Sequence, residues 1–214
     1  MLRTPLIRFY QFREHYRESG FLSAVKLTFY KCERVCPVEK DLSSFEGGIK
    51  TFDGTDYRII ELDENNFENL NYRYSLKSRY ERAGQYFKQG FKTFVLVKGQ
   101  DIIGDVWYVN KANSRMQCIH PRVKWFGIQM GPDDVYMFDL YMKPNERGGA
   151  LTTTFMAGVL KLLKDKGFTK AYGDYVVTNI PALWIHRMLG YKEMPVFVVK
   201  RYFIYEVGSP GISR

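Results

Sequence analysis

Residues 134–167, DVYMFDLYMKPNERGGALTTTFMAGVLKLLKDKG, constrain the fold more than any other stretch of the chain. Nearly every residue from Val135 to Met142 is apolar or aromatic, which is typical of a strand buried on both faces. Pro144 lacks an N–H group and therefore ends the pairing of this strand. From Leu151 to Leu163 apolar residues recur at helical spacing, and Gly167 is a typical helix stop. The stretch predicts a buried strand, a tight turn and a helix.

The turn between this strand and this helix predicts an anion site. Gly148 and Gly149 allow unusual backbone dihedrals and carry no side chain that would block a ligand. The helix start adds unpaired N–H groups and the positive end of the helix dipole. We therefore predict that a phosphate or pyrophosphate binds at this turn.

Composition limits the class of protein. The chain has 214 residues, of which 45% are hydrophobic, so we expect a packed core in one domain, with or without an appendage. It contains no apolar run of about 18 residues, and its start lacks the uninterrupted apolar core of a signal peptide. Three cysteines are too few for a disulfide framework, which favours a reducing cytoplasm. Cys32 and Cys36 have no second ligand pair nearby, so buried helical thiols are preferred over a zinc site.

The formal charge of +9 favours an acidic partner, which would be a nucleic acid, an anionic membrane surface or a phosphorylated ligand. Residues 1–45 predict an N-terminal helical extension, with helices over Thr4–Ser19 and Phe21–Val35 and basic residues around their apolar positions. These helices either lie on an anionic membrane or pack on the main domain with their charges in water. Four acidic residues dilute the basic face and favour packing.

Residues 46–54 carry three glycines and no periodic pattern, and we place a boundary there, before a main domain over residues 50–207. The patterns of the main domain first predict a strand at 57–62, helices at 63–74 and 76–89, a hairpin over 93–109 and an irregular stretch at 110–132. The strand and helix described above follow. The domain then ends with a strand at 169–177, a short helix ending at Leu189, and strands at 191–194 and 196–205. Long connections are often functional, so we expect substrate contacts in the irregular stretch. The tail from Gly208 is expected to be frayed.

Two segments together resemble the GNAT superfamily of N-acetyltransferases. LYMKPNERGGALT, residues 140–152, resembles the family's fourth strand and its acyl-CoA loop, [QR]-x-x-G-x-[GA]. NIPALWIHRMLGY, residues 179–191, resembles a later helix that begins Asn-x-x-Ala and ends Leu-Gly-aromatic, and the hairpin with Gly104 lies where the family has strands two and three. The resemblance covers residues 55–206. It implies a mixed α/β (α+β) fold, with a central, mostly antiparallel sheet of six to seven strands flanked by helices.

The resemblance implies an acyl-CoA-dependent N-acyltransferase, in the first place an N-acetyltransferase, with acetyl-CoA as co-substrate and no metal. An amine would attack the thioester directly. The residues that the motifs assign to acyl-CoA are Tyr141, Met142, Arg147, Gly148, Gly149, Ala150, Leu151, Thr152, Asn179 and Ala182. Two residues depart from the family's loop pattern: Ala150 stands at its first glycine position and Thr152 at its second small position.

Two residues are candidates for catalysis. His186 lies where many family members have a tyrosine near the sulfur, and a histidine there would protonate the thiolate or relay the amine's proton; otherwise it is a packing residue. Asp139 is a lone carboxylate within the apolar strand, either a base in the cleft whose pKa burial raises or a partner for a backbone group at a bend. His120 is a weaker candidate on the amine side, and Tyr175 and Tyr191 are alternative acids.

The expected partner is an amine-bearing acceptor, for which the basic balance favours an anionic molecule. Peripheral membrane contact through the N-terminal helices and a homodimer are further candidate partners, whereas no nucleic acid is expected. This places the protein in the cytoplasm or at the inner face of the membrane. Two other functions compete with the enzyme: a non-catalytic acyl-CoA-binding module, and a basic protein that binds membranes or nucleic acids.

Overall fold

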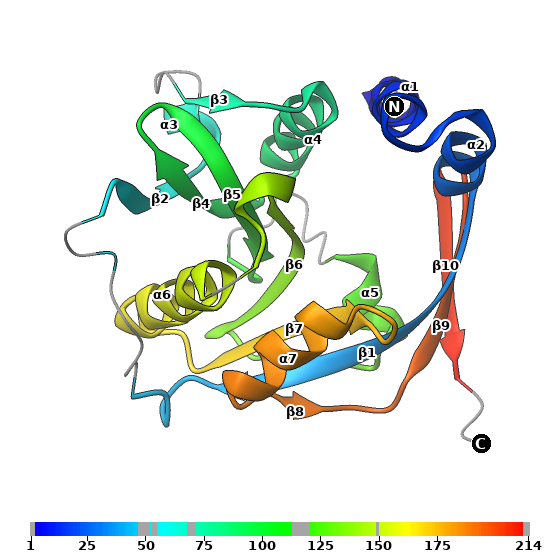
Figure 1. Ribbon diagram of the computed structural model, residues 1–214. Coiled ribbons are helices and arrows are strands. Elements are labelled where there is room, and N and C mark those ends of the chain that lie inside the picture. Colours follow the sequence, from blue (N-terminus) through cyan, green and yellow to red (C-terminus); the bar gives the residue numbers. More distant parts are fainter. Residues whose placement is uncertain are drawn as a thin grey trace.

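The structure is a computed structural model that describes residues 3–46, 52, 55–67, 72–112, 120–148 and 150–211. These residues form a ten-stranded sheet with helices on both faces (Figure 1). The order of its main strands is β10-β9-β1-β7-β6-β5-β4-β2, with β3 beside β5 and β8 beside β1. The strands are β1 (Tyr30–Asp41), β2 (Tyr57–Leu62), β3 (Arg73–Tyr74), β4 (Lys92–Lys98), β5 (Asp101–Val109), β6 (Asp134–Met142), β7 (Lys170–Val176), β8 (Lys192–Glu193), β9 (Phe197–Tyr202) and β10 (Tyr205–Pro210).

The sheet is mostly antiparallel, as predicted, because only the β6–β7 and β3–β5 pairs are parallel among the described strands. It has more strands than the six to seven expected. The difference comes from β1, β3 and β10, which the sequence patterns did not predict. Helical structure was expected over residues 63–74; the described ones form α3 (Glu64–Phe67) and then β3, and residues 68–71 lie outside the described part of the chain.

Two hydrophobic clusters lie on opposite faces of the sheet. On one face lie α6 (Leu151–Asp165) and α7 (Ile180–Met188). The cluster on this face includes Val38 of the sheet and Phe155 and Leu160 of α6. On the other face α4 (Lys77–Lys88) and α5 (Pro121–Trp125) cover a cluster that includes Trp107 and Tyr136. Strands β5 and β6 lie between these layers, and this explains why their sequences are apolar almost without interruption.

The prediction of a second helix over residues 21–35 is wrong in its second half. Helix α1 (Arg3–Ser19) is followed by α2 (Phe21–Phe29), and β1 begins at the next residue. From Tyr30 to Val35 the side chains alternate between exposed and more buried positions, the two-residue period of a strand. Pro37 does not end a helix, because it lies within β1. The residues before it, up to Val35, pair with β9, and the residues after it, from Val38, pair with β8. Cys32 is accordingly exposed and Cys36 buried, on a strand rather than on a helix.

Strand β1 joins the N-terminal residues to the centre of the sheet. It pairs with β7 over Val35–Asp41 and with β9 over Tyr30–Val35. The sheet therefore contains strands from both sides of the boundary predicted at residues 46–54. Most residues of this boundary lie outside the described part of the chain, so the boundary stays a prediction. The remaining N-terminal segment, α1 and α2, lies against α4 and the end of the β9–β10 hairpin (Figure 1).

The C-terminal tail is ordered further than expected. Gly208–Pro210 belong to β10 and pair with β9, and the hairpin turns at Phe203, whose φ of 52° is left-handed. Residues 212–214 lie outside the described part of the chain. No described helix is long and apolar enough to cross a membrane.

Candidate functional site

The two parallel strands in the middle of the sheet separate from each other. Strands β6 and β7 pair only where Asp134–Tyr136 faces Lys170–Tyr172, although both strands continue for several residues. Beyond this point β6 bulges: Asp139 has a left-handed φ of 52°, and the β5–β6 register shifts opposite it. The separation frees the β7-facing edge of β6 from sheet pairing.

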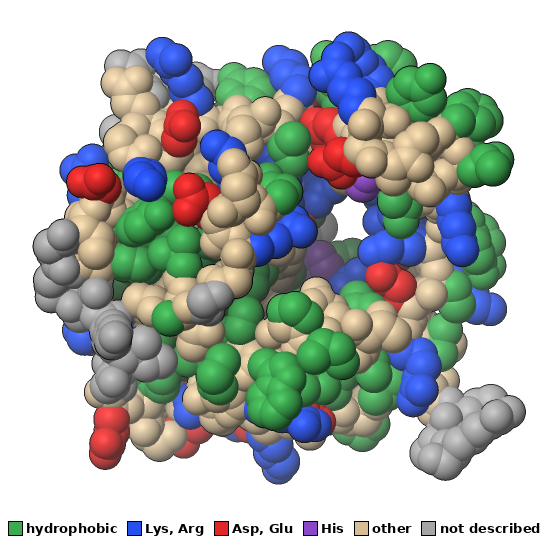
Figure 2. Space-filling model, viewed as in Figure 1, with side chains coloured by type: hydrophobic (Ala, Val, Ile, Leu, Met, Phe, Trp, Pro, Cys, Tyr) green, Lys and Arg blue, Asp and Glu red, His purple; other side chains and the backbone are tan. Residues whose placement is uncertain are grey.

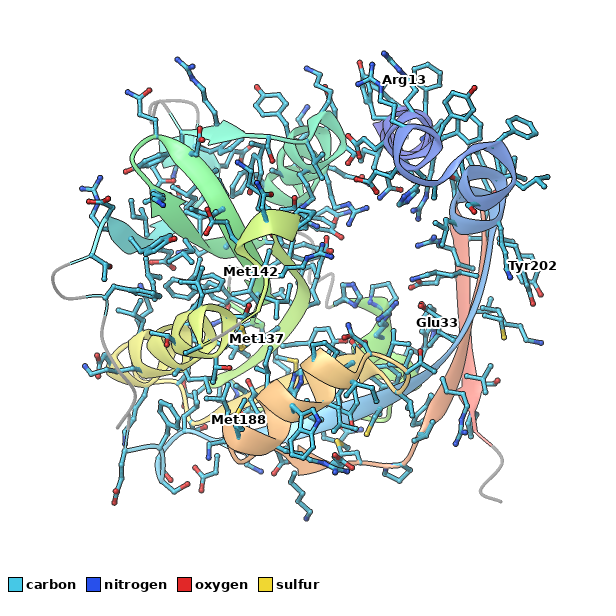
Figure 3. The ribbon with its side chains drawn as sticks, viewed as in Figure 1. Arg13, Glu33, Met137, Met142, Met188 and Tyr202 are labelled. Carbon is cyan, nitrogen blue, oxygen red and sulfur yellow. The ribbon has the colours of Figure 1, made fainter. Side chains whose placement is uncertain are left out.

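A groove opens at this separation, with a volume of about 660 Å³. We call it the β6–α7 groove; the end of β6, the start of α6 and one side of α7 line it. Met142 near the end of β6 and Met188 on α7 border it from opposite sides (Figure 3). It contains seven of the residues that the motifs assigned to acyl-CoA, namely Tyr141, Met142, Arg147, Gly148, Thr152, Asn179 and Ala182.

Of the other three assigned residues, the two that the structure describes, Ala150 and Leu151, do not line the groove. Ala150 is the N-cap of α6 and Leu151 packs against the hydrophobic core, while Gly149 lies outside the described residues.

Local backbone features shape the groove as the sequence predicted. Gly148 has a φ of 102°, which favours glycine, and the Arg147 Nε–H donates to the Met142 carbonyl over 2.8 Å. No side chain of a described residue caps α6, so the first N–H groups of this helix have no capping acceptor in that part of the chain. The Asn179 side chain accepts the Ala182 N–H over 3.2 Å and begins α7.

The structure does not bring His186 into the β6–α7 groove. Its ring lies between Tyr175 and Tyr191, at centroid distances of 5.2 and 4.9 Å. Its Nδ1–H donates to the Ala182 carbonyl over 2.7 Å, and burial lowers its pKa. Burial also raises the pKa of both tyrosines, neither of which lines the groove. This geometry favours the packing role of His186.

A second cavity lies on the other side of β6, with a volume of about 320 Å³. It is enclosed by α1, α4, the residues around α5 and the β9–β10 hairpin, and Figure 2 shows an opening there, bordered largely by charged side chains. We call it the arginine cavity, after Arg8, Arg82, Arg122 and Arg201. Phe138 and Asp139 line the arginine cavity, whereas the next residue, Leu140, lines the β6–α7 groove.

Asp139 forms ion pairs with two arginines of α4. Its carboxylate accepts from Arg79 Nη1 over 2.9 Å and from Arg82 Nη1 over 2.8 Å. Burial would raise its pKa, but the two guanidinium groups outweigh burial and hold the pKa well below its usual range. The expectation of a raised pKa is therefore wrong, and its partners are side chains rather than a backbone group. Asp139 is an ionised anchor at the bulge of β6.

Arg79 also pairs with a second, more deeply buried carboxylate. Arg79 binds Asp105 of β5, which is 1% exposed. Burial raises the pKa of Asp105 to about 6, against the opposing effect of Arg79. Two strands are thus tied to α4 through one guanidinium group.

His120 lies in the arginine cavity, within the stretch where we expected substrate contacts. Its ring packs on Phe138 and Tyr136, at centroid distances of 4.5 and 5.3 Å. Its Nδ1 accepts the Arg122 N–H over 3.4 Å as the cap of α5, so Nε2 carries the proton of the neutral ring. Burial and then Arg122 lower its pKa to about 4, so the ring is neutral near pH 7.

The sequence did not predict the arginine cavity itself. Arg8, Arg82 and Arg201 come from α1, α4 and β9, and no local pattern joins them. The described residues contain no group of three or more His, Cys, Asp or Glu side chains that would hold a metal ion.

We predict that Asp139→Asn lowers the free energy of unfolding by about 2–4 kcal/mol, because it removes the anion that pairs with Arg82 and leaves Arg79 with Asp105 alone. The matched control is Asp165→Asn, which removes an exposed pair with Lys161 and should cost below about 1 kcal/mol. Denaturant unfolding measures both. Equal, small effects would show that the Asp139 ion pairs do not fix this part of the fold.

Comparisons with solved structures support the fold. A fungal multi-domain GH3 β-N-acetylglucosaminidase, described as containing a GCN5-related glucosamine N-acetyltransferase region, aligns over 92% of this chain with a TM-score of 0.56 and 16% identity. A Drosophila protein aligns over 87% of the chain with a TM-score of 0.51 and 12% identity. The aligned parts span 23% and 57% of those two chains, respectively.

No protein-family model and no curated protein matches the sequence. At these identities the structural likeness concerns the fold, and it agrees with the two motifs that the sequence carries at residues 140–152 and 179–191. The chain therefore has the fold of the GNAT superfamily of N-acetyltransferases.

Proposed function

We propose that this protein is an acyl-CoA-dependent N-acyltransferase, in the first place an N-acetyltransferase. One observation carries the proposal: consecutive residues of β6 line two different cavities, one on each side of the strand. An acyl group held beside Leu140 in the β6–α7 groove would face an amine entering from Phe138 and Asp139 in the arginine cavity. Holding two reactants in such an arrangement supplies much of the catalysis of a direct transfer.

The groove fits an acyl-CoA in its size and in its groups. Its volume falls in the range of small-molecule sites. The unpaired edge of β6 at Tyr141 and Met142 offers backbone groups to an amide-containing arm. The uncapped start of α6, with Gly148 and Thr152 on the groove, offers N–H groups and a positive dipole to a pyrophosphate.

In the proposed reaction the amine nitrogen attacks the thioester carbon, the new C–N bond forms and the C–S bond breaks. The amine's proton passes to water in the arginine cavity, and the released thiolate takes up a proton from solvent. Asp139 is fully engaged by arginines and holds its proton only at very low pH, so it orients Arg79 and Arg82 rather than accepting the proton.

The cofactor site is tested by Thr152→Glu. A carboxylate in the first turn of α6 is compatible with the helix dipole, but it would repel a pyrophosphate at the groove. We expect the wild-type protein to bind acetyl-CoA, with a higher melting temperature, and the variant to bind at least about tenfold more weakly, a loss of about 1.4 kcal/mol.

Gln89→Glu is the matched control, because it makes the same change of charge at an exposed residue outside both cavities. Isothermal titration of the three proteins with acetyl-CoA measures the effect. If acetyl-CoA does not bind the wild-type protein, the proposed function is wrong. Binding without thiol release on any of a panel of amines would indicate a non-catalytic acyl-CoA-binding module.

The role of His186 is tested by His186→Phe, which keeps an aromatic ring between Tyr175 and Tyr191 but removes the titrating group. We expect the rate of thiol release from acetyl-CoA to stay close to that of the wild-type protein. Tyr191→Phe serves as a second isosteric control. A proton-transferring residue typically contributes at least ~100-fold, so a loss of that size with unchanged acetyl-CoA affinity would make His186 catalytic.

We also propose that the protein contacts an anionic membrane surface. Among the described residues, most exposed large apolar side chains gather on α1, α2, the start of β1 and the β9–β10 hairpin, including Phe9, Leu22 and Tyr205. Arg13 on α1 and Tyr202 on β9 lie on this part of the molecule (Figure 3). Apolar side chains combined with exposed basic residues such as Arg17 and Lys26 suit the interface of a membrane with anionic lipids.

Leu22→Asn tests this contact, because Leu22 is 83% exposed on α2 and its loss should not disturb folding. We expect sedimentation with phosphatidylcholine vesicles that contain phosphatidylserine to fall roughly tenfold. Ile180→Asn, at an exposed residue of α7, should leave sedimentation unchanged. If the wild-type protein is instead a dimer that Leu22→Asn dissociates, the surface is a subunit interface and the membrane proposal is wrong.

A further inference from the structure

The charges of the arginine cavity are not balanced by the side chains that line it. Four arginines line the cavity, together with only two carboxylates, Asp139 and Glu206. Asp139 is bound by Arg79 and Arg82, and Glu206 accepts from Arg122 Nη2 over 3.1 Å. Both carboxylates are therefore engaged by neighbouring arginines, and His120 is neutral near pH 7.

Arg8 and Arg201 remain without a carboxylate partner in the part of the chain that the structure describes. Arg8 Nη1 donates to the Gln11 side chain over 2.7 Å, and Arg201 Nη2 donates to the Leu27 carbonyl over 2.8 Å. The Nε–H groups of both arginines are buried and find no hydrogen-bond acceptor among the described residues. A buried donor without an acceptor is costly. Because both side chains line the cavity and neither has a direct carboxylate contact among the described residues, their guanidinium groups are available to an anion in the cavity.

The two guanidinium groups also act on each other. Burial, followed by the positive charges of Arg201 and Arg82, lowers the pKa of Arg8 to about 10. Burial is also the largest cause that lowers the pKa of Arg201; Glu206 opposes it, and Arg82 and Arg122 lower the pKa further. Glu206 opposes this repulsion at both arginines, but it is held by Arg122, and a bound anion would supply a further counter-charge.

We propose that Arg8 and Arg201 bind an anionic group, a carboxylate or a phosphate, on the acceptor molecule whose amine is acylated. The proposal rests on the proposed function, since it takes the arginine cavity as the acceptor site. Arginine suits this task because its planar guanidinium group can donate two parallel hydrogen bonds to a carboxylate or a phosphate. The neutral ring of His120 adds an N–H donor on the cavity wall, and the amine would lie toward β6 at Phe138.

The anion site is tested on protein saturated with coenzyme A, which occupies the other expected anion site at α6. Inorganic phosphate and succinate are added separately, and the melting temperature is measured. We expect at least one of them to raise it, on the order of 5 °C at a hundredfold excess over its dissociation constant. Which of the two acts distinguishes a phosphate-bearing acceptor from a carboxylate-bearing one.

The shift should disappear in Arg8→Gln and in Arg201→Gln and persist in Arg17→Gln, the same change at an exposed residue of α1. Both cavity variants should fold, because each removes a charge that is repelled by its neighbours. Arg8→Lys and Arg201→Lys, which keep the charge but lose the fork, should show an intermediate shift. A shift that survives in both Gln variants, or no shift with either anion, overturns the proposal.

Transfer to matched amines tests whether the anion belongs to the acceptor. Glucosamine 6-phosphate is compared with glucosamine, and glycine with glycinamide, by thiol release from acetyl-CoA. We expect the anionic member of at least one pair to react faster, and this preference to be lost in Arg201→Gln. Equal rates within both pairs overturn the assignment.

Acetyl-CoA binding is measured on the same variants, so that the two proposals can fail separately. If acetyl-CoA binds but neither anion does, the anion site is wrong and the acyltransferase stands. If acetyl-CoA does not bind, the proposed function is wrong whatever the anions do.

Discussion

The ion pairs between Asp139 and two arginines of α4 hold the part of the structure on which both cavities depend. At Asp139 the backbone of β6 takes a left-handed conformation that non-glycine residues rarely adopt. Arg79 and Arg82 bind the carboxylate at this point, and Arg79 also reaches Asp105 on β5. Buried ion pairs contribute little net stability, but they fix geometry because breaking one leaves an uncompensated charge. Here they fix the bulge at which β6 turns away from β7.

The bulge gives β6 two different surroundings in a few residues. Before it, Val135–Phe138 are buried within the sheet; after it, Leu140–Met142 line an open groove. The groove has an apolar wall from α7 and a polar end at the start of α6, whereas the cavity behind β6 is walled by arginines. A ligand with a long apolar arm and a phosphate end suits the first, and a small anionic molecule suits the second. The strand that separates them is where an acyl group and an amine would meet.

The N-terminal residues take part in this arrangement at two levels. Strand β1 lies between β7 and β9, so the sheet could not reach the β9–β10 hairpin without it. Helix α1 then packs against α4, where the Ser78 N–H donates to Glu14 over 3.1 Å, and brings Arg8 to the cavity. The same helices expose apolar side chains on their outer side. One segment thus closes the proposed acceptor site and presents the proposed membrane surface.

The sequence by itself determined the elements whose signals are local. The apolar run of β6, the glycine turn, the start of α7 at Asn179 and the motifs around them predicted the GNAT fold and most of the groove, because each depends on residues adjacent in the chain. Tertiary structure alone decided the rest. A run such as Tyr30–Asp41 becomes a strand only because β7 and β9 are there to pair with it. Asp139 has a low pKa because α4 supplies two arginines. His186 contacts Tyr175 and Tyr191 because the side of α7 that carries His186 packs on β7. Charge and burial at these positions depend on neighbours distant in sequence, and only the folded chain brings them together.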